Sequence, residues 1–194
     1  MKDIPVVIVG GGPVGLTASI LLSQAGIRSL LVERHPGTAI HTKARAINGR
    51  SMEIFHQCGV EDAIRAAGLA PQQTGMIVWA RTLAGEEIER RVPWRAGPQA
   101  ALVTPVRNCL CAQDSLEPVL RRFAEQLGPG EVRFSTEAVS FEQDGDGVTL
   151  VLENFEDRIQ LRYFEQPLDS FRRIQDRHVT ILVPNRGPDR NHLT

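Results

Sequence analysis

The apolar positions near the start of the chain follow a strand, helix, strand pattern. Residues 6–9 are four consecutive β-branched residues, which is typical of a strand buried on both faces. From Leu16 to Ala25 apolar residues recur at helical spacing, and Gly26 follows where a left-handed residue commonly ends a helix. Residues 30–32 form a second apolar run. The pattern therefore predicts a β-α-β unit at the start of the chain.

Two helices are predicted after a polar segment that covers residues 38–46. Asn48 is a suitable cap for a helix that runs through Cys58, since its side-chain oxygen can accept a hydrogen bond from a first-turn amide. A shorter helical pattern covers residues 61–67 and ends at Gly68.

A hairpin pattern follows these helices. Residues 76–81 and 86–92 alternate in polarity on either side of Ala84 and Gly85, which predicts two antiparallel strands joined by a turn. The second strand is rich in charge, so we expect it to expose one face. Residues 101–103 are a candidate for a further strand.

The last part of the chain combines one helix with several strands. Asp114 or Ser115 would cap the helix, which places Pro118 in its first turn, and Gly128 would end it. Strands are predicted at residues 132–134, 138–141, 148–152, 159–163 and 179–183. All these elements together predict an α/β fold: a Rossmann-like domain with a mostly parallel sheet and a small antiparallel β insertion.

Glycines stand at a phosphate-binding spacing directly after the first strand. Gly10, Gly12 and Gly15 fit the pattern G-x-G-x-x-G, in which they permit a tight turn, close approach of a pyrophosphate and close packing of the helix. Glu33 ends the second strand, where an acidic side chain can bind an adenosine ribose and would repel a 2′-phosphate. These residues favour FAD or NAD over NADP, and the alternative is a glycine turn that binds no ligand.

Composition narrows the possible partners. The 194 residues are 42% hydrophobic and 23% charged, with a formal net charge of -1. This balance gives no general attraction to nucleic acid or to an anionic membrane, and we expect neither as a partner.

Three cysteines, Cys58, Cys109 and Cys111, cannot form a closed set of disulfides and favour a reducing compartment. We interpret them as structural thiols and predict no metal site. The first residues carry no long apolar run of the signal-peptide kind, so the expected location is the cytoplasm.

Four segments in a fixed order resemble the amino-terminal part of the FAD-dependent aromatic-ring hydroxylases, the single-component flavoprotein monooxygenases. The resemblance is strongest to members that act on phenols and polyketides. The segments lie at residues 7–16, 32–34, 44–54 and 113–120.

The resemblance implies roles for individual residues. The loop Gly10, Gly12, Pro13, Val14 and Gly15 would hold the FAD pyrophosphate, and the remaining contacts would come from Glu33, Arg34, Arg45, Gln113 and Val139. Glu33 and Arg34 would hold the adenosine end, Arg45 would reach the isoalloxazine or ribityl chain, and the backbone near Val139 would flank the adenine. The alternatives are that both arginines are solvated and that Gln113 only caps its helix.

The chemistry implied by the family belongs mostly to the flavin. NAD(P)H, the co-substrate, reduces FAD, and one oxygen atom then passes through a flavin hydroperoxide to a small aromatic substrate, a phenol or a polyketide. The protein orients the ring and excludes water, so we assign no catalytic side chain.

The chain departs from the family after Tyr163. Family members carry an Asp-Gly motif there that contacts FAD and the nicotinamide nucleotide, whereas this chain continues Phe164, Glu165, Gln166. We predict an FAD-binding domain over residues 1–163, with the insertion at about 76–103, and an atypical tail over 164–194. A shifted reading frame or truncation would explain the tail, as would a shortened natural relative with a new ending.

Three functions from different classes follow. The first is an FAD-dependent monooxygenase, and the second is a non-catalytic FAD-binding remnant or partner subunit. The third is an NAD-binding dehydrogenase domain, which has no need of the segments around Arg45 and Gln113.

Overall fold

The computed structural model describes residues 4–41, 43–70, 77–91, 104–144, 147–154, 158–163 and 180–182. The chain divides into two compact units. The first contains residues 1–40 and 120–194, and the second contains residues 41–119. Each unit is described by itself below.

A parallel sheet forms the centre of the first unit, as predicted. Its strand order is β11-β1-β2-β7, and every neighbouring pair is parallel. The strands are β1 (Val6–Val9), β2 (Ser29–Val32), β7 (Glu131–Arg133) and β11 (Thr180–Leu182). Residues 180–182 of the predicted strand at 179–183 therefore form a strand, and it pairs with the edge of β1 that β2 leaves open.

Helix α1 (Pro13–Gln24) connects β1 to β2, which gives the predicted β-α-β unit. It ends two residues before Gly26, which adopts the expected positive φ of 73°. Alternate residues of β1 point to opposite faces of the sheet. Ile8 lies on the α1 face, because its Cγ2 atom is 3.2 Å from the position that a Cβ on Gly15 would occupy.

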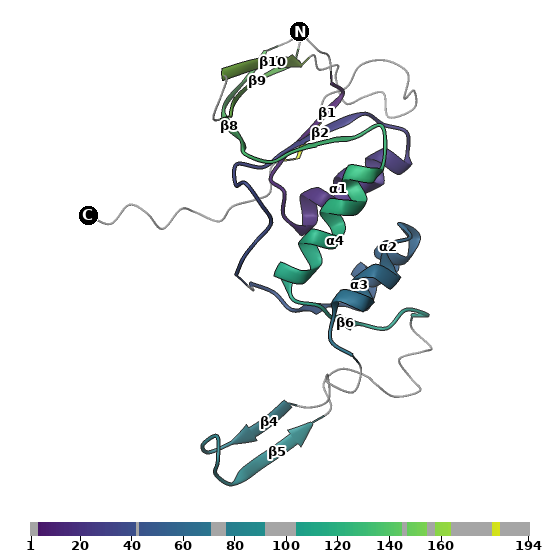
Figure 1. The fold of residues 1–194 in the computed structure, drawn as a ribbon, viewed down its shortest axis with the longest axis vertical. Helices are drawn as coiled ribbons and strands as arrows, with labels where there is room; N and C mark the ends of the chain where they lie inside the picture. Colours follow the sequence, from purple (N-terminus) through teal and green to yellow (C-terminus); the bar gives the residue numbers. More distant parts are fainter. Residues whose placement is uncertain are drawn as a thin grey trace, which may run out of the picture. The chain divides into compact units, whose positions relative to one another are not determined.

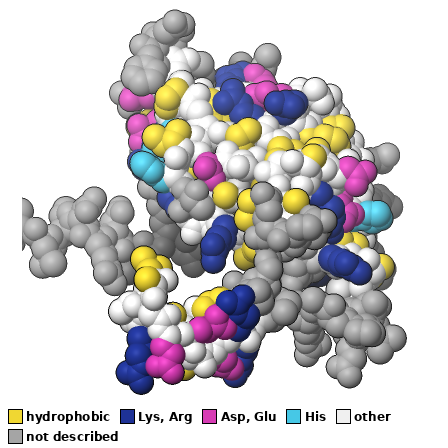
Figure 2. All heavy atoms as spheres, turned by 60° about the horizontal axis from the view of Figure 1, so that its bottom comes forward, with side chains coloured by type: hydrophobic (Ala, Val, Ile, Leu, Met, Phe, Trp, Pro, Cys, Tyr) yellow, Lys and Arg dark blue, Asp and Glu magenta, His cyan; other side chains and the backbone are white. Residues whose placement is uncertain are grey.

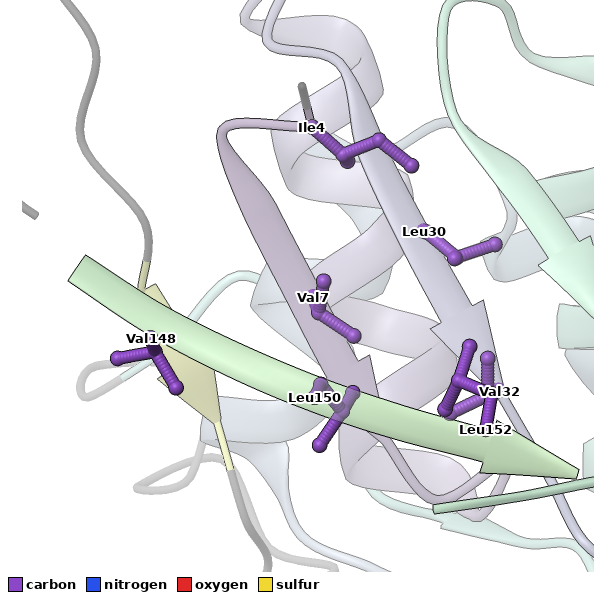
Figure 3. Close-up of a cluster of buried hydrophobic side chains, with 7 residues drawn as sticks. All are labelled: Ile4, Val7, Leu30, Val32, Val148, Leu150 and Leu152. Atoms are coloured by element: carbon purple, nitrogen blue, oxygen red, sulfur yellow. The ribbon is translucent and has the colours of Figure 1, made fainter. Parts of the chain in front are cut away.

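An antiparallel sheet with the order β10-β9-β8 covers the other face of β1 and β2 (Figures 1 and 3). Its strands are β8 (Thr136–Asp144), β9 (Gly147–Asn154) and β10 (Arg158–Tyr163). Figure 3 shows β9 crossing the parallel strands, with its alternate side chains directed at them. The residues buried between the two sheets are Ile4, Val7, Leu30, Val32, Val148, Leu150 and Leu152.

Short helices and a two-stranded ribbon make up the described core of the second unit. They are β3 (Ala46–Ile47), α2 (Gly49–Gln57), α3 (Glu61–Ala67) and β6 (Cys109–Leu110). The Asn48 side chain accepts a 2.8 Å hydrogen bond from the Ser51 amide, so the predicted cap of α2 is confirmed. Arg65 of α3 donates to the carbonyl of Arg107 at 2.7 Å and ties α3 to the segment before β6.

The predicted hairpin consists of β4 (Ile77–Ala80) and β5 (Glu87–Arg91), which pair antiparallel. Every residue of both strands is exposed, so the expectation of a single exposed face was too narrow. Arg90 pairs with Glu87, and Arg91 pairs with Glu89. Figure 2 shows acidic and basic side chains next to one another on the face that it presents. Residues 101–103 lie outside the described residues.

Helix α4 (Gln113–Gln126) begins earlier than predicted and contains residues of both units. The amides of Ser115 and Leu116 both donate to the carbonyl of Ala112, at 2.9 and 2.8 Å. Asp114 and Ser115 therefore belong to the first turn and do not cap the helix, and Pro118 lies beyond that turn in the helix interior. The polar segment predicted for residues 38–46 also ends sooner, because Ala46 pairs with Leu110 in the β3–β6 ribbon.

No helix among the described residues is both long enough and apolar enough to cross a membrane.

Candidate functional site

The candidate site is the loop between β1 and α1, at the carboxyl end of the parallel strands, where α/β folds commonly bind ligands. Gly10 has a φ of 112°, a conformation that L side chains rarely adopt, and its amide donates to the carbonyl of Val32 at 2.8 Å. A Cβ on Gly15 would lie 2.0 Å from the Gly10 carbonyl oxygen. The loop and the first turn of α1 thus pack together only because both positions are glycine.

The amino terminus of α1 is free of side-chain capping. Gly12 is the N-cap residue, with φ −76° and ψ −178°, and Pro13 occupies the first helical position. Gly12 has no side chain that could accept hydrogen bonds from the first-turn amides. Val14, in that turn, is 76% exposed. Amides at a helix amino terminus carry a partial positive charge, so this turn fits the pyrophosphate of a dinucleotide.

Glu33 lies beside the loop, where an acid that binds ribose is expected. Its Oε2 atom accepts a hydrogen bond from the Gly11 amide at 2.7 Å. Its Oε1 atom accepts from the His35 amide at 2.9 Å and lies 2.6 Å from His35 Nδ1. Burial alone would raise the pKa of Glu33, but the hydrogen bonds from His35 and Gly11 outweigh it and hold the pKa below its usual value. The carboxylate is therefore kept charged and oriented toward the loop.

Four residues at or near the loop were given no individual role from the sequence: Gly11, His35, Arg121 and Phe134. A Cβ on Gly11 would lie 2.9 Å from Glu33 Cβ and 3.2 Å from Phe134 Cζ, so the second glycine of the run is needed as well. The Arg121 guanidinium stacks over the Phe134 ring, with 3.8 Å between its Cζ atom and the ring centroid. The run of three glycines in the sequence was a signal for Gly11. The position of His35, two residues after Glu33, was a signal for His35. Nothing near Phe134 in the sequence connects it to the loop.

The other predicted contacts of the first unit lie on its surface. Arg34 is exposed. Val139 is 43% exposed and is the extra residue of a β-bulge, since Ala138 pairs with Leu152 and Ser140 pairs with Val151. A bulge interrupts the ladder and leaves local backbone groups for other partners, which suits the backbone contact expected there.

The second unit holds the remaining two predicted contacts. Arg45 is exposed. The amide of Gln113 donates to the Ala44 carbonyl at 2.8 Å, and its side-chain Nε2 donates to Oε1 of the buried Glu117 at 2.6 Å. Glu117 thereby orients the Gln113 side chain at the start of α4. The alternative that Gln113 only caps its helix does not agree with the structure, because its side chain donates to the Glu117 carboxylate one turn later.

The three cysteines are buried and form no disulfide among the described residues, which agrees with structural thiols. Burial raises the pKa of Cys58 and of Cys109. Burial, with smaller contributions from Cys109 and Asp114, raises the pKa of Cys111 to about 11. All three thiols are therefore protonated at neutral pH, which makes them poor nucleophiles.

Comparison with known proteins gives the family. The sequence profile of a family described as "FAD binding domain" matches residues 3–162. The chain belongs to this family.

Its relatives include hydroxylases and monooxygenases. It is 44% identical over 156 residues to a protein of Streptomyces halstedii that is named as a polyketide hydroxylase. This match covers 78% of this chain and 27% of the relative. It is 35% identical over 153 residues to the phenol 2-monooxygenase of Pseudomonas sp. strain EST1001, covering 77% of this chain and 25% of that enzyme. The chain thus spans about a quarter of the length of these relatives.

The fold agrees with a solved member of the same class. The crystal structure of the flavin-dependent monooxygenase PieE in complex with FAD and substrate matches with a TM-score of 0.76 and 36% identity. The match covers 83% of this chain and 29% of that one. The α/β fold expected from the sequence is therefore confirmed, as is the resemblance to part of the aromatic-ring hydroxylases.

Proposed function

We propose that this chain binds FAD at the β1–α1 loop and is the FAD-binding part of a monooxygenase that hydroxylates phenolic or polyketide rings. The observation that carries the proposal is the hydrogen bond from the Gly11 amide to Glu33, beside an α1 amino terminus that has no side-chain cap. This arrangement offers amides to phosphates and a carboxylate to a ribose at adjacent positions. It fits a dinucleotide whose adenosine carries no 2′-phosphate.

Each predicted residue has a role in this proposal. The backbone of Gly10, Gly12, Pro13, Val14 and Gly15 surrounds the pyrophosphate. Glu33 accepts hydrogen bonds from the adenosine ribose, Arg34 lies at the same end, and the bulge at Val139 flanks the adenine. In the second unit, Arg45 and Gln113 supply contacts to the flavin half of FAD.

When bound, FAD would supply the redox chemistry, taking electrons from NAD(P)H and activating dioxygen for transfer of one oxygen atom to an aromatic ring. The task of this chain is to hold the cofactor and keep its Glu33 carboxylate charged. The proposed FAD-binding domain covers residues 1–163, with a hairpin insertion at about 76–103. Of the remaining residues, 164–194, the described strand β11 pairs with β1 and so belongs to the same parallel sheet, which corrects the expectation of an atypical tail outside the domain.

A second candidate is an FAD-binding module without activity of its own. The departure from the family after Tyr163 favours it, because the chain continues Phe164, Glu165, Gln166 where family members carry an Asp-Gly motif. Both candidates predict that the chain retains FAD. Only the monooxygenase candidate predicts catalytic turnover.

The test is the visible absorbance of the purified chain after incubation with FAD and passage through a desalting column. We expect retained flavin in the unchanged chain and loss of flavin in Gly12→Val. The backbone angles of Gly12 are allowed for valine, so this variant should fold but place a branched side chain against the phosphates. Gly37→Ala is the control, because a Cβ there meets no atom within 4 Å.

Equal flavin retention by Gly12→Val and the unchanged chain would contradict the site. Absence of flavin from a chain with a folded circular dichroism spectrum would contradict FAD binding by this chain alone. If flavin is retained, oxidation of NADPH in the presence of a phenol distinguishes an enzyme from a binding module.

A further inference from the structure

Three buried serines meet at the end of α1 that lies away from the candidate site. Ser19 and Ser23 are one turn apart on α1 and therefore share a face, and Ser29 is the first residue of β2. Their exposed fractions are 0%, 5% and 1%. None of the three hydroxyl oxygens has a hydrogen-bond partner among the residues that the structure describes.

Gly130 marks the point on which the three hydroxyls converge. It precedes β7, and the pairing of Leu30 with Glu131 places it next to Ser29. A Cβ built on Gly130 would lie 2.4 Å from Ser23 Oγ, 3.4 Å from Ser29 Oγ and 3.5 Å from Ser19 Oγ. Three polar atoms from a helix and a strand thus lie close together beside a residue that has no side chain.

We propose that Ser19, Ser23 and Ser29 hold one internal water molecule beside Gly130. Buried hydroxyls in native proteins are nearly always hydrogen-bonded, and a buried water commonly makes about three hydrogen bonds to groups that lack other partners. A hydroxyl can both donate and accept, so three of them can satisfy a water with either orientation. Water is the occupant that we infer, because the three groups are uncharged hydroxyls that lie near one another and lack other partners among the described residues.

This water would join α1 to the amino end of β2, beside the residue that precedes β7. The candidate nucleotide site lies at the opposite, carboxyl end of the same strands, so the water does not depend on FAD binding. Its role would be to fasten the far end of the β-α-β unit whose near end carries the glycine loop.

The decisive variant is Ser29→Ala, measured by urea unfolding of the full chain. If Ser29 bonds a water, its loss should lower the folding equilibrium constant about fivefold, the value of one ordinary hydrogen bond. If its hydroxyl has no partner in the folded protein, alanine should leave the constant unchanged or raise it, and the proposal fails. Ser140→Ala, at an exposed position of β8, is the matched control and should change nothing.

A second measurement distinguishes a bound water from direct hydrogen bonds, either among the serines or from the serines to carbonyls of α1. Nuclear magnetic resonance should show a cross-peak between a long-lived water and the Gly130 amide, which Ser29→Ala weakens or removes. Destabilisation by Ser29→Ala without such a cross-peak in the unchanged chain would overturn the proposal. FAD retention should be equal in both proteins, so this result is independent of the proposed function.

Discussion

Strands β1 and β4 have the same length and similar apolar character, but their surroundings differ. Both contain four residues. β1 lies between two parallel neighbours, with α1 on one face and β9 on the other, and Val7 is fully buried. Among the described residues β4 pairs with β5 alone, and all four of its residues are exposed.

The difference separates what a strand pattern determines from what burial adds. An apolar or alternating run is enough to form a strand, and both runs do so. Burial comes only from elements that pack on the strand, and apolar area removed from water contributes about 25 cal/mol per Å². The free energy of unfolding should therefore depend strongly on the β1–β2 region and weakly on the β4–β5 hairpin.

The largest expected effect is that of Gly15→Ala. A methyl at this position would lie 2.0 Å from the Gly10 carbonyl oxygen, so the loop must move away from α1. We expect a loss of roughly 3 kcal/mol or more in the free energy of unfolding, measured by urea denaturation. Gly37→Ala, which meets no atom within 4 Å, should change it by less than about 0.5 kcal/mol. Equal stability of the two variants would show that the loop is not packed on α1.

Next in size is Leu150→Ala, in the layer between the two sheets of the first unit. Leu150 is 2% exposed, and truncation should lower the free energy of unfolding by about 2–5 kcal/mol. Ile88→Ala removes a comparable volume from β5, where the side chain is 65% exposed, and should cost less than about 0.5 kcal/mol. A similar loss in both variants would contradict the contrast between the two regions.

The same contrast explains which features the sequence could predict. The β-α-β unit was predictable because each signal is local: a branched apolar run, glycines at fixed spacing and an acid after the second strand. Asn48 was predictable as a cap for the same reason. The layering of β8–β10 on β1 and β2 was not, since an amphipathic strand does not specify the surface that it covers.

The site follows the same rule. Glu33 was predicted from its distance to Gly15, and it does bond the loop. Phe134 was missed because it reaches Gly11 only through the pairing of β7 with β2. Pro118 was misplaced because α4 begins at Gln113, one residue before the acid expected to cap it.

Glu33→Gln should have a smaller effect that depends on pH. The folded pKa of Glu33 is below its unfolded value of about 4.3, so the carboxylate stabilises the fold above that pH. This contribution is lost as the pH falls through the folded pKa. The variant should therefore be less stable than the unchanged chain at pH 7, and the difference should be smaller at pH 3, as measured by urea unfolding at both values.

Glu86→Gln in the hairpin is the control for that experiment. Glu86 lies 3.7 Å from Arg81, and both side chains are more than three-quarters exposed. Exposed ion pairs of this kind contribute little to stability, so the difference from the unchanged chain should be small at both pH values. A difference at pH 7 as large as that of Glu33→Gln would remove the distinction between the two carboxylates.

The smallest expected effect is that of Arg91→Met at the end of β5. The guanidinium lies 5.9 Å from the centroid of the Trp79 ring and pairs with Glu89, and all three residues are exposed. Cation–π contacts and ion pairs at such positions contribute up to about 1 kcal/mol, and methionine retains part of the contact with the ring. We expect the free energy of unfolding to fall by less than about 0.5 kcal/mol. A loss above about 2 kcal/mol would mean that the hairpin is packed against another part of the protein in solution, since a single exposed contact does not contribute that much to the free energy of unfolding.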